Sequence, residues 1–232
     1  MSLVGRRVVV SAGPTYEDID PVRFIGNRSS GKMGFAIAAE AAARGAQVVL
    51  VAGPVHMATP AGVTRVDVRS AQQMHDAVLA QLADWQSPCD VYIGAAAVAD
   101  FTPRAAAANK LKKQPGQDTL TLELVKTRDI LADVAIHARR PALVVGFAAE
   151  TDKVAEYARG KLERKRVDMI CANRVGLQGS GFESDDNALL VIDRDGERAL
   201  GPASKTALAR DLLGFIATKL NDTPSAPAAQ ET

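Results

Sequence analysis

The sequence predicts an α/β fold: a Rossmann-like, doubly wound and mostly parallel sheet with an irregular β arm. Short apolar runs rich in Val and Ile recur without polar alternation, as expected of strands buried on both faces of a parallel sheet. Stretches with helical spacing of apolar residues lie between several of these runs. One segment, residues 101–127, breaks the alternation and is the predicted arm.

The predicted strands end in small or polar residues, where an open parallel sheet places its ligand loops. They are RVVVSAG (7–13), QVVLVAG (47–53), DVYIGAA (90–96), ALVVGFAAE (142–150), DMICAN (168–173) and NALLVID (187–193).

The predicted helices carry apolar residues three or four positions apart. An Ala-rich helix runs from Gly31 to Arg44 and stops at Gly45, and another begins at Ser70 as its N-cap. In the second helix, Met74, Val78, Leu82 and Trp85 share the apolar spacing. Three more helices are predicted at 129–139, 152–166 and 203–220.

The arm contains a basic loop, a Pro-Gly turn and the alternating run TLTLELV, which predicts a β-rich flap. Such an arm either covers a site or pairs with another subunit. We expect residues 1–220 to form a single nucleotide-binding domain. The Pro- and Ala-rich stretch 221–232 is predicted to be a disordered tail.

Charge and composition exclude several classes of protein. The formal net charge of +1 gives no whole-molecule attraction for nucleic acid or anionic membranes. No signal peptide is visible, and no apolar stretch approaches the ~20 residues that span a bilayer. The two cysteines, Cys89 and Cys171, have no metal-like spacing, which indicates a reducing compartment. The expected protein is cytoplasmic.

The stretch GNRSSGKM (26–33) nearly matches a phosphate-binding P-loop, but Met33 stands where a Ser or Thr should hold magnesium. The first predicted strand also ends about 13 residues earlier, which a P-loop does not allow. The stretch does open a helix, whose first N–H groups bind anions. Two interpretations stay open here: an anion site, or a simple helix cap.

Two further strand ends carry small residues that let a base or ribose approach the backbone. GAAAVADF (94–101) ends in Asp100, which holds a metal or ribose hydroxyl in one interpretation and caps a helix in the other. GFAAET (146–151) is a second strand end with small residues. The loop SAGPT (11–15) lacks G-x-G-x-x-G, so a nicotinamide dinucleotide site is not supported.

Basic residues form two groups. Lys110 lies in NKLKKQ (109–114), which is either a solvated loop or a phosphate-binding one, and Lys161 and Lys165 share one helix face. Two small-residue strand ends and two basic groups indicate a nucleotide between them. No catalytic His or Cys pattern appears, so an enzyme of this sequence works by positioning and charge neutralisation.

These motifs together resemble one family. AGPT, IDPVRFIGNRSSGKMGFAIA, GAAAVADF, KLKK, VVGFAAET, DMICAN and GFESDDNAL occur in the order typical of bacterial phosphopantothenate–cysteine ligases, from about Gly5 to Leu220. The resemblance implies a CTP-dependent ligase in coenzyme A biosynthesis. It joins 4′-phosphopantothenate to L-cysteine through an acyl-cytidylate and releases pyrophosphate and CMP. It also implies Mg²⁺, a homodimer, and a fused or associated phosphopantothenoylcysteine decarboxylase.

The resemblance assigns roles by position. Asn27, Arg23 and Lys110 would be catalytic, with Asn27 bonding the acyl-cytidylate, Arg23 supporting its acyl or phosphate end, and Lys110 matching the catalytic-loop lysine. Asp100 would contact the nucleotide or its metal. The remaining binding residues would contact nucleotide or phosphate: Ser29, Ser30, Gly31, Lys32, Met33, Gly94, Ala95, Ala96, Asp129, Phe147, Lys161 and Lys165.

One departure from the family pattern concerns the turn before the third helix. The family commonly has Asn-Pro-Asp-Ile where this chain reads Thr127-Arg128-Asp129-Ile130, which puts nucleotide contacts there in question. Three rival interpretations are kept: an ATP-using form of the same ligase, a nucleotide-binding regulator without catalysis, and a dehydrogenase.

Overall fold

The structure is a computed structural model that describes residues 1–113, 115–116, 118–150, 152–174 and 186–222. An eight-stranded sheet has the order β12-β11-β10-β9-β6-β1-β4-β5. The strands from β10 to β5 run parallel, whereas β11 and β12 are antiparallel. The predicted Rossmann-like fold is confirmed, with the correction that residues 187–193 lie in an antiparallel strand.

All six predicted strands are present, and two unpredicted ones complete the sheet. The strands are β1 (Arg7–Ala12), β4 (Gln47–Ala52), β5 (Val63–Asp67), β6 (Val91–Gly94), β9 (Leu143–Glu150), β10 (Met169–Arg174), β11 (Asp186–Asp193) and β12 (Gly196–Ser204).

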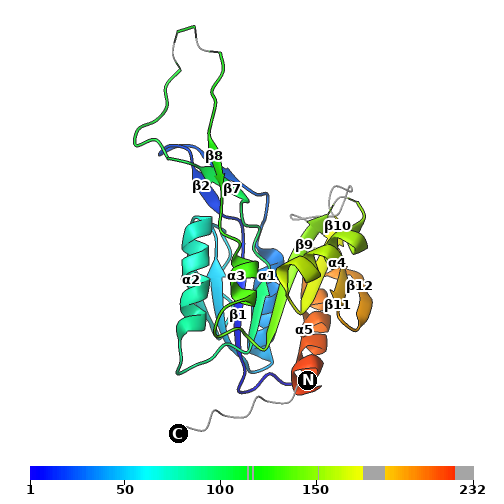
Figure 1. Ribbon diagram of the computed structural model, residues 1–232. Coiled ribbons are helices and arrows are strands. Elements are labelled where there is room, and N and C mark those ends of the chain that lie inside the picture. The colour runs from blue at the N-terminus through cyan, green and yellow to red at the C-terminus, as the bar shows by residue number, and fades with distance from the viewer. Residues whose placement is uncertain (114, 117, 151, 175–185, 223–232) are drawn as a thin grey trace.

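The helices cover both faces of the sheet (Figure 1). They are α1 (Lys32–Ala43), α2 (Ala71–Ala83), α3 (Ile130–Ala135), α4 (Val154–Lys165) and α5 (Lys205–Asp222). Side chains of α1 and α5 pack in one core layer with Val8 and Val10 of β1. Those of α2, α3 and α4 pack in the other with Val9. Burial on both faces explains why β1 lacks polar alternation.

Two helix boundaries differ from those predicted. A capping box of Ser70 and Gln73 starts α2, but the helix ends at Ala83. Trp85 therefore lies beyond the helix and is 72% exposed, so its predicted place on the apolar face is wrong. The last helix, α5, reaches Asp222, past the predicted boundary at 220. Residues 223–232 of the predicted tail lie outside the described residues.

The arm is less β-rich than predicted. Among the described residues of the arm, only β7 (Phe101–Pro103) and β8 (Leu124–Lys126) form paired strands, and the described chain between them extends far from the sheet (Figure 1). The predicted strand 119–125 is thus mostly loop in its described residues. An unpredicted hairpin, β2 (Tyr16–Asp18) and β3 (Phe24–Gly26), lies beside the base of the arm.

The strand order reverses between β1 and β6, so the loops after these two strands meet at one edge of the sheet. The N–H of Ala97 donates to the carbonyl of Gly13 at 2.9 Å, and the N–H of Ala99 donates to Oγ1 of Thr15 at 3.0 Å. Ligands bind at this kind of reversal in open α/β sheets. No helix in the described part of the chain is long and apolar enough to cross a membrane.

Candidate nucleotide and acid-binding site

Two cavities open at this edge of the sheet. The first, of about 510 Å³, lies between β6, the arm, α3 and α4. The second, of about 500 Å³, lies between the start of α1, the segment after β6, and the ends of β9 and β10. Both are lined by Ala96, Val98, Asp100, Phe147 and Lys161. The cavities therefore adjoin, and a ligand can extend from one into the other.

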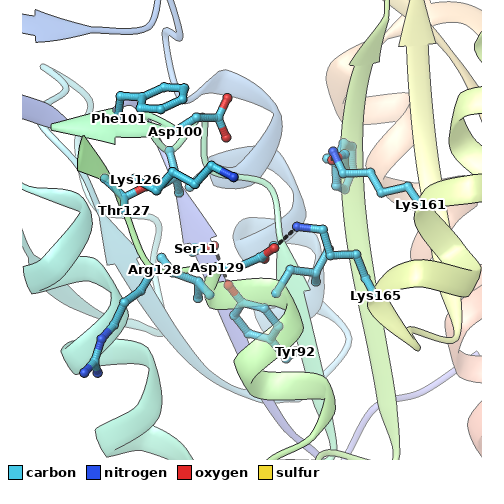
Figure 2. Close-up of a pocket in the computed structure, with 16 residues that line it drawn as sticks. Ser11, Tyr92, Asp100, Phe101, Lys126, Thr127, Arg128, Asp129, Lys161 and Lys165 are labelled. Atoms are coloured by element: carbon cyan, nitrogen blue, oxygen red, sulfur yellow. Dashed lines mark hydrogen bonds and ion pairs between the residues drawn. The ribbon is translucent and has the colours of Figure 1, made fainter. Parts of the chain in front are cut away.

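In the first cavity, two lysines of α4 face the opposite wall (Figure 2). Lys165 forms an ion pair with Asp129, the N-cap of α3. Lys161 donates to the backbone carbonyl of Phe147 at 3.4 Å. Burial, and then the neighbouring charge of Lys165, lowers the pKa of Lys161 from its ordinary value. The negative charge of a bound polyphosphate would oppose this shift and raise the pKa of Lys161 again.

The floor of the first cavity is a buried polar pair. The hydroxyls of Ser11 in β1 and Tyr92 in β6 lie 2.9 Å apart (Figure 2). Burial raises the pKa of Tyr92 well above its ordinary value, so this phenol stays neutral at any working pH. The pair therefore offers neutral hydrogen-bonding groups to a ligand, suitable for a base or a ribose.

At Thr127 and Arg128, the turn before α3 differs from the usual sequence of the family. Its backbone is ordered even though it lacks the usual proline. The hydroxyl of Thr127 donates to the carbonyl of Ala99 at 2.6 Å, and its N–H donates to the carbonyl of Asp100 at 3.0 Å. Figure 2 shows the guanidinium of Arg128 pointing away from Lys161 and Lys165. The two hydrogen bonds of Thr127 therefore hold Asp129 in the cavity wall, in place of the rigid ring of a proline.

In the second cavity, the start of α1 supplies backbone donors. Gly31 takes a left-handed conformation, with φ of 77°, and no side chain caps the helix. The first bond of the helix runs from the N–H of Phe35 to the carbonyl of Gly31, so the N–H groups before it have no acceptor within the helix. A Cβ added to Gly34 would come within 2.4 Å of the Cβ of Ala12, so a glycine at this position lets the start of α1 pack closely against β1. The predicted helix start lines the second cavity.

Asn27 follows β3 and lines the second cavity. Its amide nitrogen donates to the carbonyls of Ala97 and Val98, at 3.0 and 3.1 Å. Both amide hydrogens are used in this way, so its amide oxygen is the polar atom available to a ligand. The two bonds also fix the hairpin to the segment after β6.

Arg23 and Lys110 lie elsewhere. The carboxylate of Asp20 is buried and accepts bonds from the N–H groups of Val22, Arg23 and Leu111 and from the Arg23 guanidinium. Arg23 also donates to the carbonyl of Leu111 at 2.8 Å. This cluster, called the Asp20 clamp below, holds the backbone next to Lys110. The bond from Arg23 and, more weakly, those from backbone N–H groups keep the pKa of Asp20 far below its usual range.

The structure thus brings most of the predicted site together and leaves two catalytic candidates outside it. Arg23 lines a separate cavity of about 350 Å³ at the arm, and Lys110 is exposed and absent from the described lining of both sheet-edge cavities. The physical reason is the clamp, which engages the Arg23 guanidinium and holds the KLKK loop beside the hairpin. Their catalytic roles stay predictions. The predicted site residues that line one or both sheet-edge cavities are Asn27, Ser29, Ser30, Gly31, Lys32, Met33, Gly94, Ala95, Ala96, Asp100, Asp129, Phe147, Lys161 and Lys165.

Sequence reasoning missed several lining residues. Ser11 and Tyr92 sit within predicted strands, where their burial marked them as core. Asn173, Asn187 and Lys205 line the second cavity from β10, β11 and α5. Asn173 and Asn187 lie inside quoted motifs, which could have marked them, but no local signal distinguished Lys205.

A divalent cation would rely on few protein ligands here. No group of three or more His, Cys, Asp or Glu side chains gathers as a metal site among the described residues. Asp100 lies at the junction of the cavities. One carboxylate together with substrate phosphates is the usual way that proteins hold Mg²⁺, so the donor set fits.

Comparison with known proteins decides the family. Residues 3–220 match the model of the "DNA/pantothenate metabolism flavoprotein C-terminal domain". The chain belongs to this family. It is 51% identical over 214 residues to the coenzyme A biosynthesis bifunctional protein CoaBC of Vibrio cholerae, covering 92% of this chain and 53% of that protein. It is 49% identical to that of Escherichia coli K12, covering 93% and 52%. The chain therefore spans about half the length of these relatives.

Solved structures of the family agree with this fold. A crystal structure of the C-terminal domain of CoaBC is 39% identical, with a TM-score of 0.79 and coverage of 95% of this chain and 98% of that one. A variant of Cab2 in complex with phosphopantothenate-cysteine is 15% identical with a TM-score of 0.74, covering 93% and 86%, and supports the fold alone.

Proposed function

We propose that this domain is a CTP-dependent phosphopantothenate–cysteine ligase. It would join 4′-phosphopantothenate and L-cysteine in coenzyme A biosynthesis. The observation that carries the proposal is the pair of adjoining cavities, which share Asp100 and Lys161. One suits a nucleotide and the other an elongated anion. Membership of a pantothenate-metabolism family supports the same substrates.

The reaction has two displacements. A carboxylate oxygen of 4′-phosphopantothenate attacks the α-phosphorus of CTP, and the bond to pyrophosphate breaks. The amine nitrogen of cysteine then attacks the acyl carbon, the bond to CMP breaks, and the ammonium proton is lost to solvent. Both nucleophiles come from substrates, so the protein has to align them and neutralise phosphate charge.

The lining residues divide this work. Phe147, Ser11 and Tyr92 would bind the cytidine, while Lys161 and Lys165 approach the phosphates. The start of α1 would hold an anionic group of the acid in the second cavity. In the second cavity, the amide oxygen of Asn27 would accept a hydrogen bond from the acyl-cytidylate or the incoming amine.

Asp100 would hold Mg²⁺ together with substrate phosphates. The cation would neutralise charge on the pyrophosphate leaving group. Lys110 would contribute a second positive charge if the arm brings it to the junction.

We also propose a homodimer that forms through the arm, in a cytoplasmic protein. Large apolar side chains are exposed on the hairpin and the arm: Val22, Phe24, Phe101, Leu120 and Leu124. Pairing of two arms would cover these side chains. In such a dimer, Lys110 of one subunit would reach the sheet-edge site of the other. A phosphopantothenoylcysteine decarboxylase, fused or associated, would consume the product; the relatives' name "bifunctional" supports this partner.

The test is pyrophosphate release from CTP and, separately, ATP, with 4′-phosphopantothenate and magnesium, with and without cysteine. We expect release with CTP and the acid, and sustained turnover when cysteine is added. Preference for ATP would identify the ATP-using form. Nucleotide binding without release under any combination would favour the non-catalytic regulator, and NAD(H) binding without CTP binding would favour a dehydrogenase.

A further inference from the structure

A buried histidine joins α2 to α3 and is absent from the described lining of both sheet-edge cavities. The side chain of His75, in α2, is 1% exposed, and its Nε2 donates to Oδ2 of Asp133 in α3 at 2.9 Å. Its Nδ1 lies 3.2 Å from Oδ1 of Asp76. An imidazole with a polar partner at each ring nitrogen is held in one orientation. His75 is therefore a fixed link between two helices that are far apart in the sequence.

The helix at the other end of this link depends on contacts with the rest of the molecule. α3 spans only Ile130–Ala135, and an isolated helix of this length is unstable in water. Its buried side chains, Ile130 and Val134, pack in the same core layer as those of α2. Apolar packing is non-directional, so it leaves α3 free to shift along its neighbour. The hydrogen bond from His75 to Asp133 is directional and fixes where α3 lies against α2.

The start of α3 forms part of the wall of the first cavity. Residues 127–131 all line this cavity, and Asp129 among them forms the ion pair with Lys165. The N–H of Asp133 donates to the carbonyl of Asp129 at 2.9 Å. The residue that His75 holds is therefore one helical turn from the residue that faces Lys165.

Arg128 connects the turn before α3 with the same part of α2. Figure 2 shows its side chain extending toward α2 and away from the two lysines of the cavity. Hydrogen bonds with Gln72 and His75, and further the nearby positive charge of Arg128, lower the pKa of Asp76 from its ordinary value. Two neighbouring side chains of α2 thus act on this segment: His75 on Asp133, and Asp76 on Arg128.

We propose that His75 is a positioning residue for the nucleotide: through Asp133 it holds α3 so that residues 127–131 keep their place in the wall of the first cavity. This inference rests on the proposed function, which places CTP in that cavity. None of the described lining residues of the second cavity belongs to α3 or to the turn before it. Loss of the link should therefore weaken binding of CTP and leave that of 4′-phosphopantothenate unchanged.

The experiment compares CTP binding, measured by titration calorimetry, in the wild type, His75→Leu and His75→Gln. Leucine fills the buried site without a donor, so we expect the dissociation constant of CTP to rise about fivefold or more. The amide nitrogen of glutamine can donate to Asp133 in place of Nε2, so His75→Gln should stay within about twofold of the wild type. From pyrophosphate release, KM for CTP should rise in His75→Leu, while KM for 4′-phosphopantothenate should not.

Leu82→Ala is the control for a general loss of stability. Leu82 is 1% exposed and lies about two turns further along α2, so its truncation should lower the melting temperature without changing the dissociation constant of CTP. Asp133→Ala removes the acceptor on α3 and should weaken CTP binding as much as His75→Leu does. The double variant should be no weaker than either single one, because both changes break the same bond. Asp133→Ala also replaces His75→Leu if that variant does not fold.

Three results would overturn the proposal: unchanged CTP affinity in folded His75→Leu and Asp133→Ala, an equal loss in Leu82→Ala, or additive losses in the double variant. If the wild type bound no CTP, the proposed function would fail, and amide hydrogen exchange over residues 127–136 would still decide the positioning role. We expect faster exchange there in His75→Leu than in His75→Gln and the wild type. Equal exchange in all three proteins would show that His75 does not hold α3.

Discussion

The sheet edge and the arm hold the two main catalytic candidates in different ways. Asn27 is fixed by two bonds to the segment after β6 and lines a cavity. Lys110 is exposed on an arm that extends from the sheet, and its neighbour Leu111 is held by the Asp20 clamp. The sheet edge is therefore built for alignment within one chain. The arm holds the charge of Lys110 outside both sheet-edge cavities, so the proposed catalytic role requires movement of the arm or association with a second chain.

The largest effect is expected from removing the charge on the arm. Lys110→Gln should lose about 2–4 kcal/mol of transition-state stabilisation if Lys110 faces developing phosphate charge, by analogy with loss of an oxyanion donor. The rate of pyrophosphate release and of amide formation would be measured at saturating substrates. Lys113→Gln, on the same loop, is the control. Wild-type rates in Lys110→Gln would show that the KLKK loop is solvated surface without a catalytic role.

Asn27→Asp tests the sheet edge. The carboxylate cannot donate to the carbonyls of Ala97 and Val98 and places negative charge against their oxygens. We expect kcat/KM to fall about 10- to 100-fold and stability to fall by about 1–3 kcal/mol. Comparison with Asn27→Ala in turnover and denaturant unfolding separates charge from lost bonding. Unchanged turnover in Asn27→Asp would remove Asn27 from the mechanism.

Asp20→Asn tests the link between the two regions. The clamp loses its charged acceptor, so Lys110 should be less well placed and kcat should fall by up to about 100-fold with KM for CTP little changed. Asp118→Asn, on the exposed part of the arm, should be neutral. A variant with normal kcat would show that the clamp serves stability alone.

The wild type and the Asp20→Asn variant also test how stability depends on pH. The pKa of Asp20 is lowered in the folded state, so its contribution to stability is present above its ordinary pKa of 3.8 and is lost as pH falls toward the folded value. The stability difference between wild type and Asp20→Asn should therefore be constant near neutral pH and shrink in acid. Denaturant unfolding at several pH values measures it, and a difference that grows in acid would contradict the assignment.

The smallest effect concerns Lys161 in the nucleotide cavity. Its pKa is lowered, so its protonation opposes folding, and this cost disappears as pH rises toward the ordinary 10.5. Bound phosphates should raise the pKa again and cause proton uptake on CTP binding at alkaline pH. Calorimetry in buffers of different ionisation enthalpy would detect this uptake, and Lys161→Met should abolish it. Equal uptake in both proteins would assign it to another group.

The parts that the sequence predicted are those with a local physical signature. Strands such as β1 are buried on both faces and must be continuously apolar, and the α1 start is marked by its glycines and serines. By contrast, β12 is largely exposed and β2 and β3 are three residues each, too short for a pattern.

The missed site residues depend on contacts between distant segments. Asn173 faces a cavity only because β11 reverses beside β10 and α5 begins next to it. The position of Arg23 also depends on Leu111, far along the chain, which accepts its bond. Motif resemblance identified Arg23 and Lys110 but carried no information about where the hairpin holds Arg23 or where the arm holds Lys110.

The most direct test of the central claim is isolation of the acyl-cytidylate. The protein would be mixed with CTP, magnesium and 4′-phosphopantothenate without cysteine, quenched, and examined by mass spectrometry. We predict the mixed anhydride of the acid and CMP in an amount equal to the pyrophosphate released, and its conversion to amide and CMP when cysteine is added. Pyrophosphate formed without the anhydride, or amide formed without CMP, would contradict the two-step mechanism.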